Sequence, residues 1–304
     1  MTIAVVHPGA AWAVSDVEAG LAHGLAEIGV SVIRQPLVSD LARALRTQSV
    51  DAAIVVCGHH ADPAAVAAVR AICPVYLLAT ETPYDLAAEL AWAARVDGGW
   101  THERTAVERF RAVNPRWAYL AHGWHPEIHR PDPLPWDMAL PAHDVVLVGA
   151  GFPERITWLN AMDWTGIDLG LYGIWEGFGL SEALEPCIQS GPIPNLQAAA
   201  LYRRARLGIN LYRRTSEPAE SLNPRAYEMA ACGLPYVTQA RAESVDVFGG
   251  LVPMCETPAA MSAAVRAALA QPRDSARAAV ATASWTERAR TVLADVQAWA
   301  TAGV

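Results

Sequence analysis

Two carboxylates placed around the start of an expected helix are the strongest candidates for chemistry in this sequence. Glu220 and Glu228 lie eight residues apart, and Asn223 and Pro224 between them suit the N-cap and the first position of a helix. A carboxylate in the first or second turn, as Glu228 would be, can accept hydrogen bonds from both hydroxyls of a ribose. The pattern indicates a ribose site, with two solvated charges as the alternative for an isolated pair.

A glycine-rich turn offers a second candidate, a site for an anion. Gly149 and Gly151 follow an expected strand over 144–148 and lead into a helix. A helix N-terminus binds phosphate, and Arg155 in the first turn could add charge, with a surface Arg beside a tight turn as the alternative. The turn could also open a dinucleotide fingerprint, but Glu154 stands where its third glycine is required. We therefore expect a phosphate site rather than an NAD site.

The composition fits a protein that buries a large core and does not attract polyanions in general. The 304 residues are 53% hydrophobic and 18% charged, and this length suggests two domains. The formal net charge is −8, which disfavours general affinity for nucleic acid. All 23 positively charged residues are Arg. The absence of Lys excludes Schiff-base catalysis on this chain and a P-loop lysine.

Cysteine usage and the first residues point to a cytoplasmic protein. Five Cys form no CxxC pair, which favours a reducing compartment over a disulfide framework or a zinc knuckle. The chain opens with a strand-like stretch over 3–6 and no basic leader. No apolar run reaches the ~18 residues that a membrane span needs, so we expect no membrane span.

Apolar runs and helical periodicity alternate along the whole chain. In the first half we expect strands over 3–6, 30–33, 52–57, 75–79, up to about 101, and 117–120, with helices over 15–28, 38–46, 63–72, 85–94 and 103–111. In the second half we expect strands over 144–148, 167–172, 207–211 and 235–238, with helices over 154–162, 195–205, 225–231 and most of the last 45 residues. Such βα units imply an α/β fold with parallel, doubly wound sheets.

A Pro-rich stretch over 129–135 separates the two halves. We expect an N-terminal domain over 1–135, a C-terminal domain over 136–283 and a terminal helix over 284–304, opened by a capping box of Ser284 and Glu287. Ligands of open α/β sheets bind beyond the carboxyl ends of the strands, so two such domains imply a cleft between them.

Several stretches together resemble the GT-B glycosyltransferases, and in particular the spore-maturation-type (CgeB-like) subgroup. Glu220-x7-Glu228 followed by Ala-Cys-Gly-x-Pro resembles the donor-site signature of the fold, and Asn223-Pro-Arg-x-Tyr-Glu-x-x-Ala-Cys-Gly resembles the subgroup. Further agreement comes from Trp100-Thr-His-Glu103, Tyr119-Leu-Ala-His122-Gly, Asp144-Val-Val-Leu-Val-Gly149-x-Gly-x-Pro-x-Arg155, Leu171-Tyr-Gly173-x-Trp175 and Ser284-Trp-x-x-Arg288. The resemblance covers roughly residues 75–295 and is weak over 1–70.

The resemblance implies two Rossmann-like domains that face a central cleft, with the terminal helix packed back on the N-terminal domain. The C-terminal domain would bind a nucleotide-sugar: Glu228 would hold the ribose, and Glu220 or the nearby Glu217 would contact the transferred sugar. The diphosphate would meet Arg155 and the turn of Gly149 and Gly151. Asn223 and Arg225 belong to the same matching donor stretch.

One departure from the resembling enzymes concerns the diphosphate. They often place a Lys there, and this chain has none. Arg213 or Arg214, after the strand expected over 207–211, could supply that charge with bidentate geometry.

The resemblance also implies which residues and ligands take part in transfer. An inverting enzyme needs a general base near its acceptor, and the N-terminal candidates are Asp16, His7 and Glu81. A plain first-turn helix acid is the alternative for Asp16. The Glu-x7-Glu pattern leans instead toward retention of configuration. No cofactor beyond the nucleotide-sugar is implied, and no metal at the His cluster over 122–129.

We therefore expect a cytoplasmic glycosyltransferase, a hexosyl- or pentosyltransferase whose acceptor is a small molecule, a glycan or a modified base in phage-type DNA. A basic and aromatic patch over 202–206 and 212–214 favours the DNA alternative locally. Two further alternatives are a nucleotide-sugar-binding module without transfer activity and a dinucleotide-dependent oxidoreductase.

Overall fold

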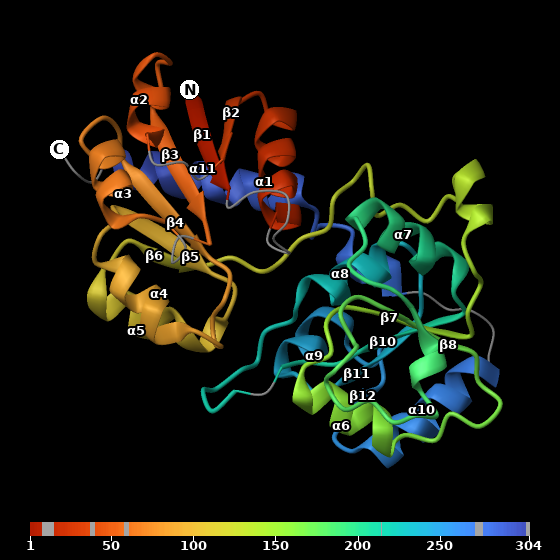
Figure 1. Ribbon diagram of the computed structural model, residues 1–304. Coiled ribbons are helices and arrows are strands. Elements are labelled where there is room, and N and C mark those ends of the chain that lie inside the picture. Colours follow the sequence, from red (N-terminus) through yellow and green to blue (C-terminus); the bar gives the residue numbers. More distant parts are fainter. Residues whose placement is uncertain (8–14, 37–39, 58–60, 214, 271–275, 302–304) are drawn as a thin grey trace. The chain divides into compact units, whose positions relative to one another are not determined.

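The structure of the protein is a computed structural model that describes residues 1–7, 15–36, 40–57, 61–213, 215–270 and 276–301 (Figure 1). It divides into two compact units. Unit 1 comprises Met1–Gly123, Thr215–Ser221 and Ala283–Val304, and unit 2 comprises Trp124–Arg214 and Leu222–Thr282. The chain therefore returns to unit 1 twice, once with the short segment over 215–221 and once with its last residues.

Unit 1 is built on a parallel sheet in the order β2-β1-β3-β4-β5-β6. Its strands are β1 (Thr2–His7), β2 (Ser31–Pro36), β3 (Ala52–Val56), β4 (Val75–Ala79), β5 (Gly98–Thr101) and β6 (Trp117–Tyr119). Its helices are α1 (Ser15–Glu27), α2 (Leu41–Arg46), α3 (Pro63–Arg70), α4 (Leu86–Ala93), the 3-10 turn η2 (Arg104–Ala106), α5 (Val107–Val113) and α11 (Trp285–Thr301).

Alternate strand residues of unit 1 enter two separate cores. Ile3 and Val5 of β1 pack with α1 and α11, whereas Ala4 and Val6 face α2 to α5. Strands covered on both faces read as continuous apolar runs, which is why the sequence predicts them well. The terminal helix lies against α1 in this unit (Figure 1), and Trp100 Nε1 donates to Asp295 Oδ2 at 2.8 Å. The expected return of the terminal helix to the N-terminal domain is confirmed.

Unit 2 is built on a second parallel sheet in the order β12-β11-β10-β7-β8-β9. Its strands are β7 (Val145–Val148), β8 (Leu169–Tyr172), β9 (Ile188–Ser190), β10 (Leu207–Asn210), β11 (Tyr236–Gln239) and β12 (Met254–Cys255). Its helices are α6 (Pro153–Ala161), α7 (Asn195–Arg204), α8 (Pro224–Ala231), α9 (Ala242–Phe248) and α10 (Pro258–Ala270), with the 3-10 turns η3 (Pro135–Ala139), η4 (Glu185–Cys187) and η5 (Ala276–Val280).

Both sheets reverse their strand order near the middle. The reversal falls between β1 and β3 in unit 1 and between β7 and β10 in unit 2. In doubly wound folds, ligands bind beyond the carboxyl ends of the strands at such a point. The two-sheet α/β architecture predicted from the sequence is confirmed, and it directs the search for a site to the residues that follow these four strands.

The differences from the predicted elements lie at sheet edges and helix ends. The short edge strands β9 and β12 and the helix α9 were not predicted, because they have few residues and little apolar periodicity. The helix expected over 103–111 is η2 followed by α5. The Pro-rich stretch over 129–135 lies within unit 2 and runs into η3. Ser284 Oγ accepts the Glu287 N–H at 3.3 Å, as its predicted cap requires.

Within the described residues, every helix is too short or too polar to cross a bilayer.

Candidate functional site

The glycine-rich turn after β7 stands at the strand reversal of unit 2. The Gly149 N–H donates to the Tyr172 carbonyl at 2.8 Å, and the Gly151 N–H donates to the Ile174 carbonyl at 2.7 Å. Both amide N–H groups therefore already donate to carbonyls at the end of β8, and these hydrogen bonds fix the turn there. A phosphate at this turn would depend on side chains and on the N-terminus of α6 rather than on the glycine amides.

Glycine is required at position 149 for two reasons. Its φ of 153° is a backbone conformation that L side chains rarely adopt. A Cβ atom at this position would lie 2.6 Å from Nη1 of Arg225 and 3.2 Å from Nη1 of Arg155. The missing side chain lets two guanidinium groups approach the turn.

Gly173, at the end of β8, packs directly on the carbonyl of Gly149. A Cβ atom on Gly173 would lie 1.9 Å from that oxygen, and its φ is 131°. We expect Gly173→Ala to displace the turn and to cost about 2 kcal/mol of unfolding free energy, because the strained backbone and the clash add. Urea unfolding would measure the loss. Gly166→Ala, at a φ of 73° with open space around it, is the control for backbone strain alone.

Arg155 and Arg225 join the carboxyl ends of β7 and β10. Arg155 donates from Nε to the Leu211 carbonyl at 3.0 Å and from Nη1 to the Ala150 carbonyl at 2.8 Å. Arg225 donates to the Val148 and Leu211 carbonyls, both at 3.1 Å. These carbonyl partners orient the guanidinium groups without carrying a full negative charge. Two fixed cations therefore span the strand reversal.

Arg213 adds a third guanidinium group at the same turn. Its Cζ lies 4.5 Å from the ring centroid of Phe152, and the Cζ of Arg155 lies 4.9 Å from the same centroid. Both cations are thus held by the π face of the residue that caps α6. Arg155 and Arg213, which were predicted for the diphosphate, thus gather with Arg225 of the donor stretch around residues 149–152. Arg214, the alternative to Arg213, lies outside the described residues.

A reciprocal pair of amides fixes the start of α8 beside β10. Asn223 caps the helix, as predicted, with Oδ1 accepting the Ala226 N–H at 3.3 Å. Asn223 Nδ2 donates to Asn210 Oδ1 at 2.8 Å, and Asn210 Nδ2 donates back to Asn223 Oδ1 at 3.1 Å. Asn210 is fully buried, so the pair is shielded from water. The first turn of α8, which carries Arg225, is therefore placed rigidly.

Glu228 lies one turn further along α8, beside a neutral histidine. His129 accepts the His125 N–H at Nδ1, so its proton is on Nε2, which donates to Asn195 Oδ1 at 3.0 Å. Burial lowers the pKa of His129 to about 3, against a smaller raising effect of Asn195. Glu228 Oε1 is 3.9 Å from that Nε2. The carboxylate thus faces a polar but uncharged ring.

The neutral state of His129 makes the fold sensitive to acid. The folded pKa lies below the unfolded value, so its contribution is complete above about pH 6.5 and is lost as the pH falls toward 3. Between pH 7 and pH 5 we expect wild type to lose about 2 kcal/mol more unfolding free energy than His129→Gln. Urea titrations at both pH values measure the difference. Equal losses in both proteins would show that His129 is not responsible.

Glu220 and Glu217, the two carboxylates predicted to face the sugar, belong to unit 1. Glu220 pairs with Arg104 at 2.8 Å, and Glu217 pairs with Arg109 at 2.5 Å. Roughly half of the Glu220 side chain is exposed. The ion pairs hold the segment over 215–221 on η2 and α5.

Glu103 binds the segment over 215–221 and was not predicted as a site residue. It is buried and accepts the N–H groups of Glu220 at 3.1 Å and Ser221 at 3.2 Å. It also caps η2 by accepting the Thr105 N–H at 3.1 Å. A buried carboxylate saturated by backbone donors fixes the chain just before Asn223. The acid in the motif Trp100-Thr-His-Glu103 was the only sign in the sequence that Glu103 has a role. Its contact with Glu220 and Ser221, more than 100 positions away, is seen only in the folded chain.

Of the three candidate bases, His7 is the last residue of β1, and Asp16 and Glu81 follow β1 and β4 in unit 1. Asp16 lies in the first turn of α1 with an exposed side chain, yet surrounding protein desolvates it enough to raise its pKa to about 6. The Glu81 N–H donates to Glu89 Oε1 at 2.9 Å. Glu89 is buried, also accepts the Thr82 hydroxyl, and has its pKa raised to about 7 by desolvation. Glu89 therefore holds the loop that presents Glu81.

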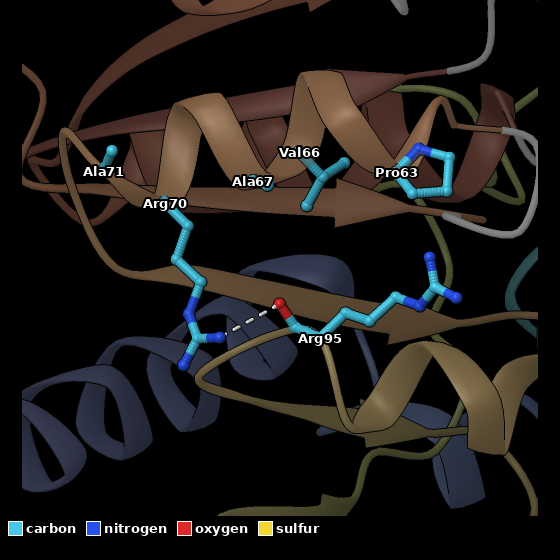
Figure 2. Close-up of a pocket in the computed structure, with 6 residues that line it drawn as sticks. All are labelled: Pro63, Val66, Ala67, Arg70, Ala71 and Arg95. Carbon is cyan, nitrogen blue, oxygen red and sulfur yellow. Dashed lines mark hydrogen bonds between the residues drawn. The ribbon is translucent and has the colours of Figure 1, made fainter.

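The remaining features lie outside these groups. His122 stacks on His102 in unit 1 with ring centroids 3.7 Å apart, while His125 and His129 contact each other in unit 2. A hollow of about 500 Å³ runs along α3 of unit 1 (Figure 2). Its lining residues are Pro63, Val66, Ala67, Arg70, Ala71 and Arg95. None of the predicted site residues lines this hollow.

Comparisons with known proteins agree with the fold. The sequence model of the "Glycosyl transferase-like" family matches residues 140–297. No curated protein matches by sequence. Among solved structures, AviGT4, a glycosyltransferase involved in avilamycin A biosynthesis, is similar with 16% identity and a TM-score of 0.65, covering 100% of this chain and 98% of its own.

Two further solved structures have the same fold. The α,α-trehalose 6-phosphate synthase of Burkholderia multivorans is 13% identical with a TM-score of 0.65, covering 100% of this chain and 99% of its own. Phage T4 BGT in complex with UDP-glucose is 13% identical with a TM-score of 0.58, covering 99% and 98%.

Proposed function

This chain belongs to the glycosyl transferase-like family and is a glycosyltransferase of the GT-B fold, and from this premise we propose that unit 2 binds a nucleotide-sugar donor through Gly149, Gly151, Arg155, Arg213, Asn223, Arg225 and Glu228. The gathering of three guanidinium groups at the strand reversal of unit 2 is the observation that supports this most strongly. A diphosphate carries the charge that such a cluster binds with bidentate geometry.

The diphosphate and the ribose of the donor each have candidate residues in unit 2. Arg155, Arg213 and Arg225 would hold the diphosphate, with Gly149 leaving room for two of them. Glu228, on the same helix as Arg225 and beside the neutral ring of His129, would accept hydrogen bonds from the ribose hydroxyls. We propose UDP as the first nucleotide to test, since T4 BGT was solved with UDP-glucose.

Glycosyl transfer builds negative charge on the leaving diphosphate, and preorganised cations stabilise it most. Arg155 and Arg225 are already oriented by carbonyls, so little reorganisation is needed when that charge develops. We propose that Glu220 contacts the transferred sugar and that Asp16 or Glu81 removes the proton of the acceptor hydroxyl. The raised pKa of Asp16, about 6, suits a base near neutral pH.

We also propose a subgroup, a role for each domain, a cellular location and a cofactor for this chain. We place the chain in the spore-maturation-type subgroup because Asn223-Pro-Arg-x-Tyr-Glu forms a cap and helix with the expected geometry. The domain limits 1–135, 136–283 and 284–304 are proposed as functional acceptor, donor and returning segments. All five Cys are free thiols, which supports a cytoplasmic location, and the donor is the only cofactor proposed.

Ligand-induced stabilisation tests the proposed function. The full chain is melted alone and with UDP-glucose, GDP-mannose or NAD, each at a hundred times its dissociation constant, where a bound ligand adds about 2.7 kcal/mol. We expect a sugar nucleotide to raise the Tm and to release its nucleotide when an acceptor is present. Stabilisation by NAD alone would exclude the glycosyltransferase donor site. Binding without any release of nucleotide would favour a binding module.

A further inference from the structure

We propose that Asn210 is a positioning residue of the donor site, whose buried carboxamide orients the guanidinium group of Arg225 toward the diphosphate while leaving its positive charge uncancelled. This inference rests on the proposed function, because it assumes that Arg225 meets the diphosphate of a sugar nucleotide. It is carried by four hydrogen bonds that the side chain of Asn210 makes at the end of β10.

Asn210 is the last residue of β10 and stands at the strand reversal of unit 2. Its exposed fraction is 0%, so water does not reach the carboxamide. The helix α8 lies against this strand (Figure 1). A carboxamide is costly to bury unless its donors and acceptors are satisfied. The presence of an amide at this position is therefore explained by its partners.

The carboxamide of Asn210 uses its full capacity for hydrogen bonds. Nδ2 donates to Asn223 Oδ1 at 3.1 Å and to the Tyr212 hydroxyl at 3.2 Å. Oδ1 accepts from Asn223 Nδ2 at 2.8 Å and from Arg225 Nε at 3.3 Å. A carboxamide has two N–H donors and two acceptor lone pairs, so this one is saturated.

Two groups that can only donate fix which end of the amide faces which partner. A guanidinium group has no acceptor, so the atom of Asn210 that faces Arg225 must be the oxygen. The Ala226 N–H also only donates, so the atom of Asn223 that caps α8 is Oδ1, and the atom of Asn210 opposite that oxygen must be the nitrogen. Both constraints give the same orientation, and a half-turn of the amide would break hydrogen bonds to both Arg225 and Asn223.

The hydrogen bond to Asn210 completes the attachment of the Arg225 guanidinium group. The two terminal nitrogens donate to the carbonyls of Val148 and Leu211, and Nε donates to Asn210 Oδ1. The plane of the group is thus set at all three nitrogens. All three acceptors are neutral oxygens, which orient the cation without adding a negative charge beside it. A carboxylate at position 210 would have nearly the same shape, but it would pair with Arg225 and compete with a phosphate.

Asn210 also fixes the backbone from which the Arg225 side chain extends. Arg225 is the second residue of α8, directly after the capped start that Asn223 forms with Asn210. Both the backbone and the Nε of Arg225 are therefore attached to the same amide. Arg155 and Arg213 are instead held against the ring of Phe152. A change at position 210 should therefore act on the cation cluster through Arg225.

Asn210→Asp tests this assignment, because it keeps the shape of the side chain and replaces the donor nitrogen by a charged oxygen. Calorimetric titration of the full chain measures the affinity for UDP, and competition with UDP measures the affinity for uridine. GDP and guanosine are used if the protein binds GDP-mannose instead. We expect about 20-fold weaker binding of UDP, because the new carboxylate captures Arg225. Uridine, which lacks the diphosphate, should bind within about threefold of wild type. Equal losses for both ligands would show a general disturbance of α8 and would overturn the inference.

A double-mutant cycle shows whether Arg225 carries the effect. In the Arg225→Gln background, Asn210→Asp should weaken UDP binding by less than about threefold, because the cation that the carboxylate captures is gone. In the Arg213→Gln background, the loss should remain about 20-fold. The same loss in both backgrounds would contradict the assignment of Asn210 to Arg225.

Asn210→Ser keeps the test decisive if Asn210→Asp does not fold. A hydroxyl is too short to reach Arg225 Nε and carries no charge, so we expect about fivefold weaker binding of UDP and unchanged binding of uridine. Asn114→Asp is the control, since its amide holds the carbonyls of Ala93 and Val96 in unit 1, and it should lower the Tm without changing either affinity. Wild-type affinity for UDP in Asn210→Ser would overturn the inference. Failure of the wild-type chain to bind either nucleotide refutes the donor site itself.

Discussion

Glu228→Gln is expected to weaken binding of the sugar nucleotide by about 50-fold while leaving the fold intact. The substitution keeps the size of the side chain and removes only its charge and one acceptor. Hydrogen bonds to a charged group contribute about 1.5–3 kcal/mol each, and a buried ribose hydroxyl left without its acceptor adds to the loss. Calorimetric titration with the sugar nucleotide measures the change directly, without any acceptor.

The specificity of this effect comes from the surroundings of Glu228. The adjacent ring of His129 is neutral, so removing the carboxylate does not leave a charged imidazole unpaired. Unfolding free energy should therefore change by less than about 1 kcal/mol at pH 7. Glu256→Gln, an exposed acid near the start of α10, is the matched control and should leave affinity unchanged. If Glu228→Gln binds as tightly as wild type, the ribose is not held by α8.

The sequence was sufficient for the parts of the site that are local. The N-cap Asn223, the glycine at 149 and the order of strands and helices all follow from short patterns, because capping and burial act over a few residues. Arg155 was predicted at a phosphate site from the glycine-rich turn, whereas Arg213 and Arg225 were predicted through the family resemblance. The three are brought together by the carbonyl oxygens of Val148, Ala150 and Leu211 and by the ring of Phe152, which no sequence pattern marks.

Contacts between residues far apart in the chain could not be predicted from the sequence. Glu103 binds backbone amides more than a hundred residues away, in the segment over 215–221 that belongs to unit 1. The stretch over 129–135 was interpreted as a linker because proline resists helix and sheet. In the structure it belongs to unit 2, and His129 at its start lies beside Glu228. Backbone propensity does not predict that His129 lies beside Glu228 or that this stretch belongs to unit 2.

A buried ion pair explains how that stretch is fastened. Asp137 of η3 and Arg203 of α7 are both almost completely buried and form a bidentate pair at 2.5 and 3.0 Å. Burial alone would raise the pKa of Asp137, but the hydrogen bonds from Arg203 and from the Leu134 N–H outweigh it and lower the pKa. Arg203 also donates to the Ile128 carbonyl at 3.1 Å. One guanidinium group thus holds both ends of the segment.

We expect Asp137→Asn to cost about 3–5 kcal/mol of unfolding free energy, because it leaves a buried guanidinium group without its counter-charge. Asp163→Asn removes the acid of an exposed pair with Arg266 and should cost less than about 1 kcal/mol. Urea unfolding of both variants measures the contrast, and equal costs would mean that the Asp137 pair is as well solvated as the exposed one.

Donor binding can show whether the Asp137–Arg203 pair also positions the segment over 128–137 or only stabilises the fold. The segment that Arg203 holds at Ile128 continues into His129, whose Nε2 lies 3.9 Å from Glu228. If the pair positions this segment, Asp137→Asn should also weaken binding of the sugar nucleotide several-fold at temperatures where the variant is folded. The double variant Asp137→Leu with Arg203→Met should recover most of the stability, since an apolar pair carries no desolvation cost. It should not recover the affinity, because the hydrogen bond from Arg203 to Ile128 is still absent.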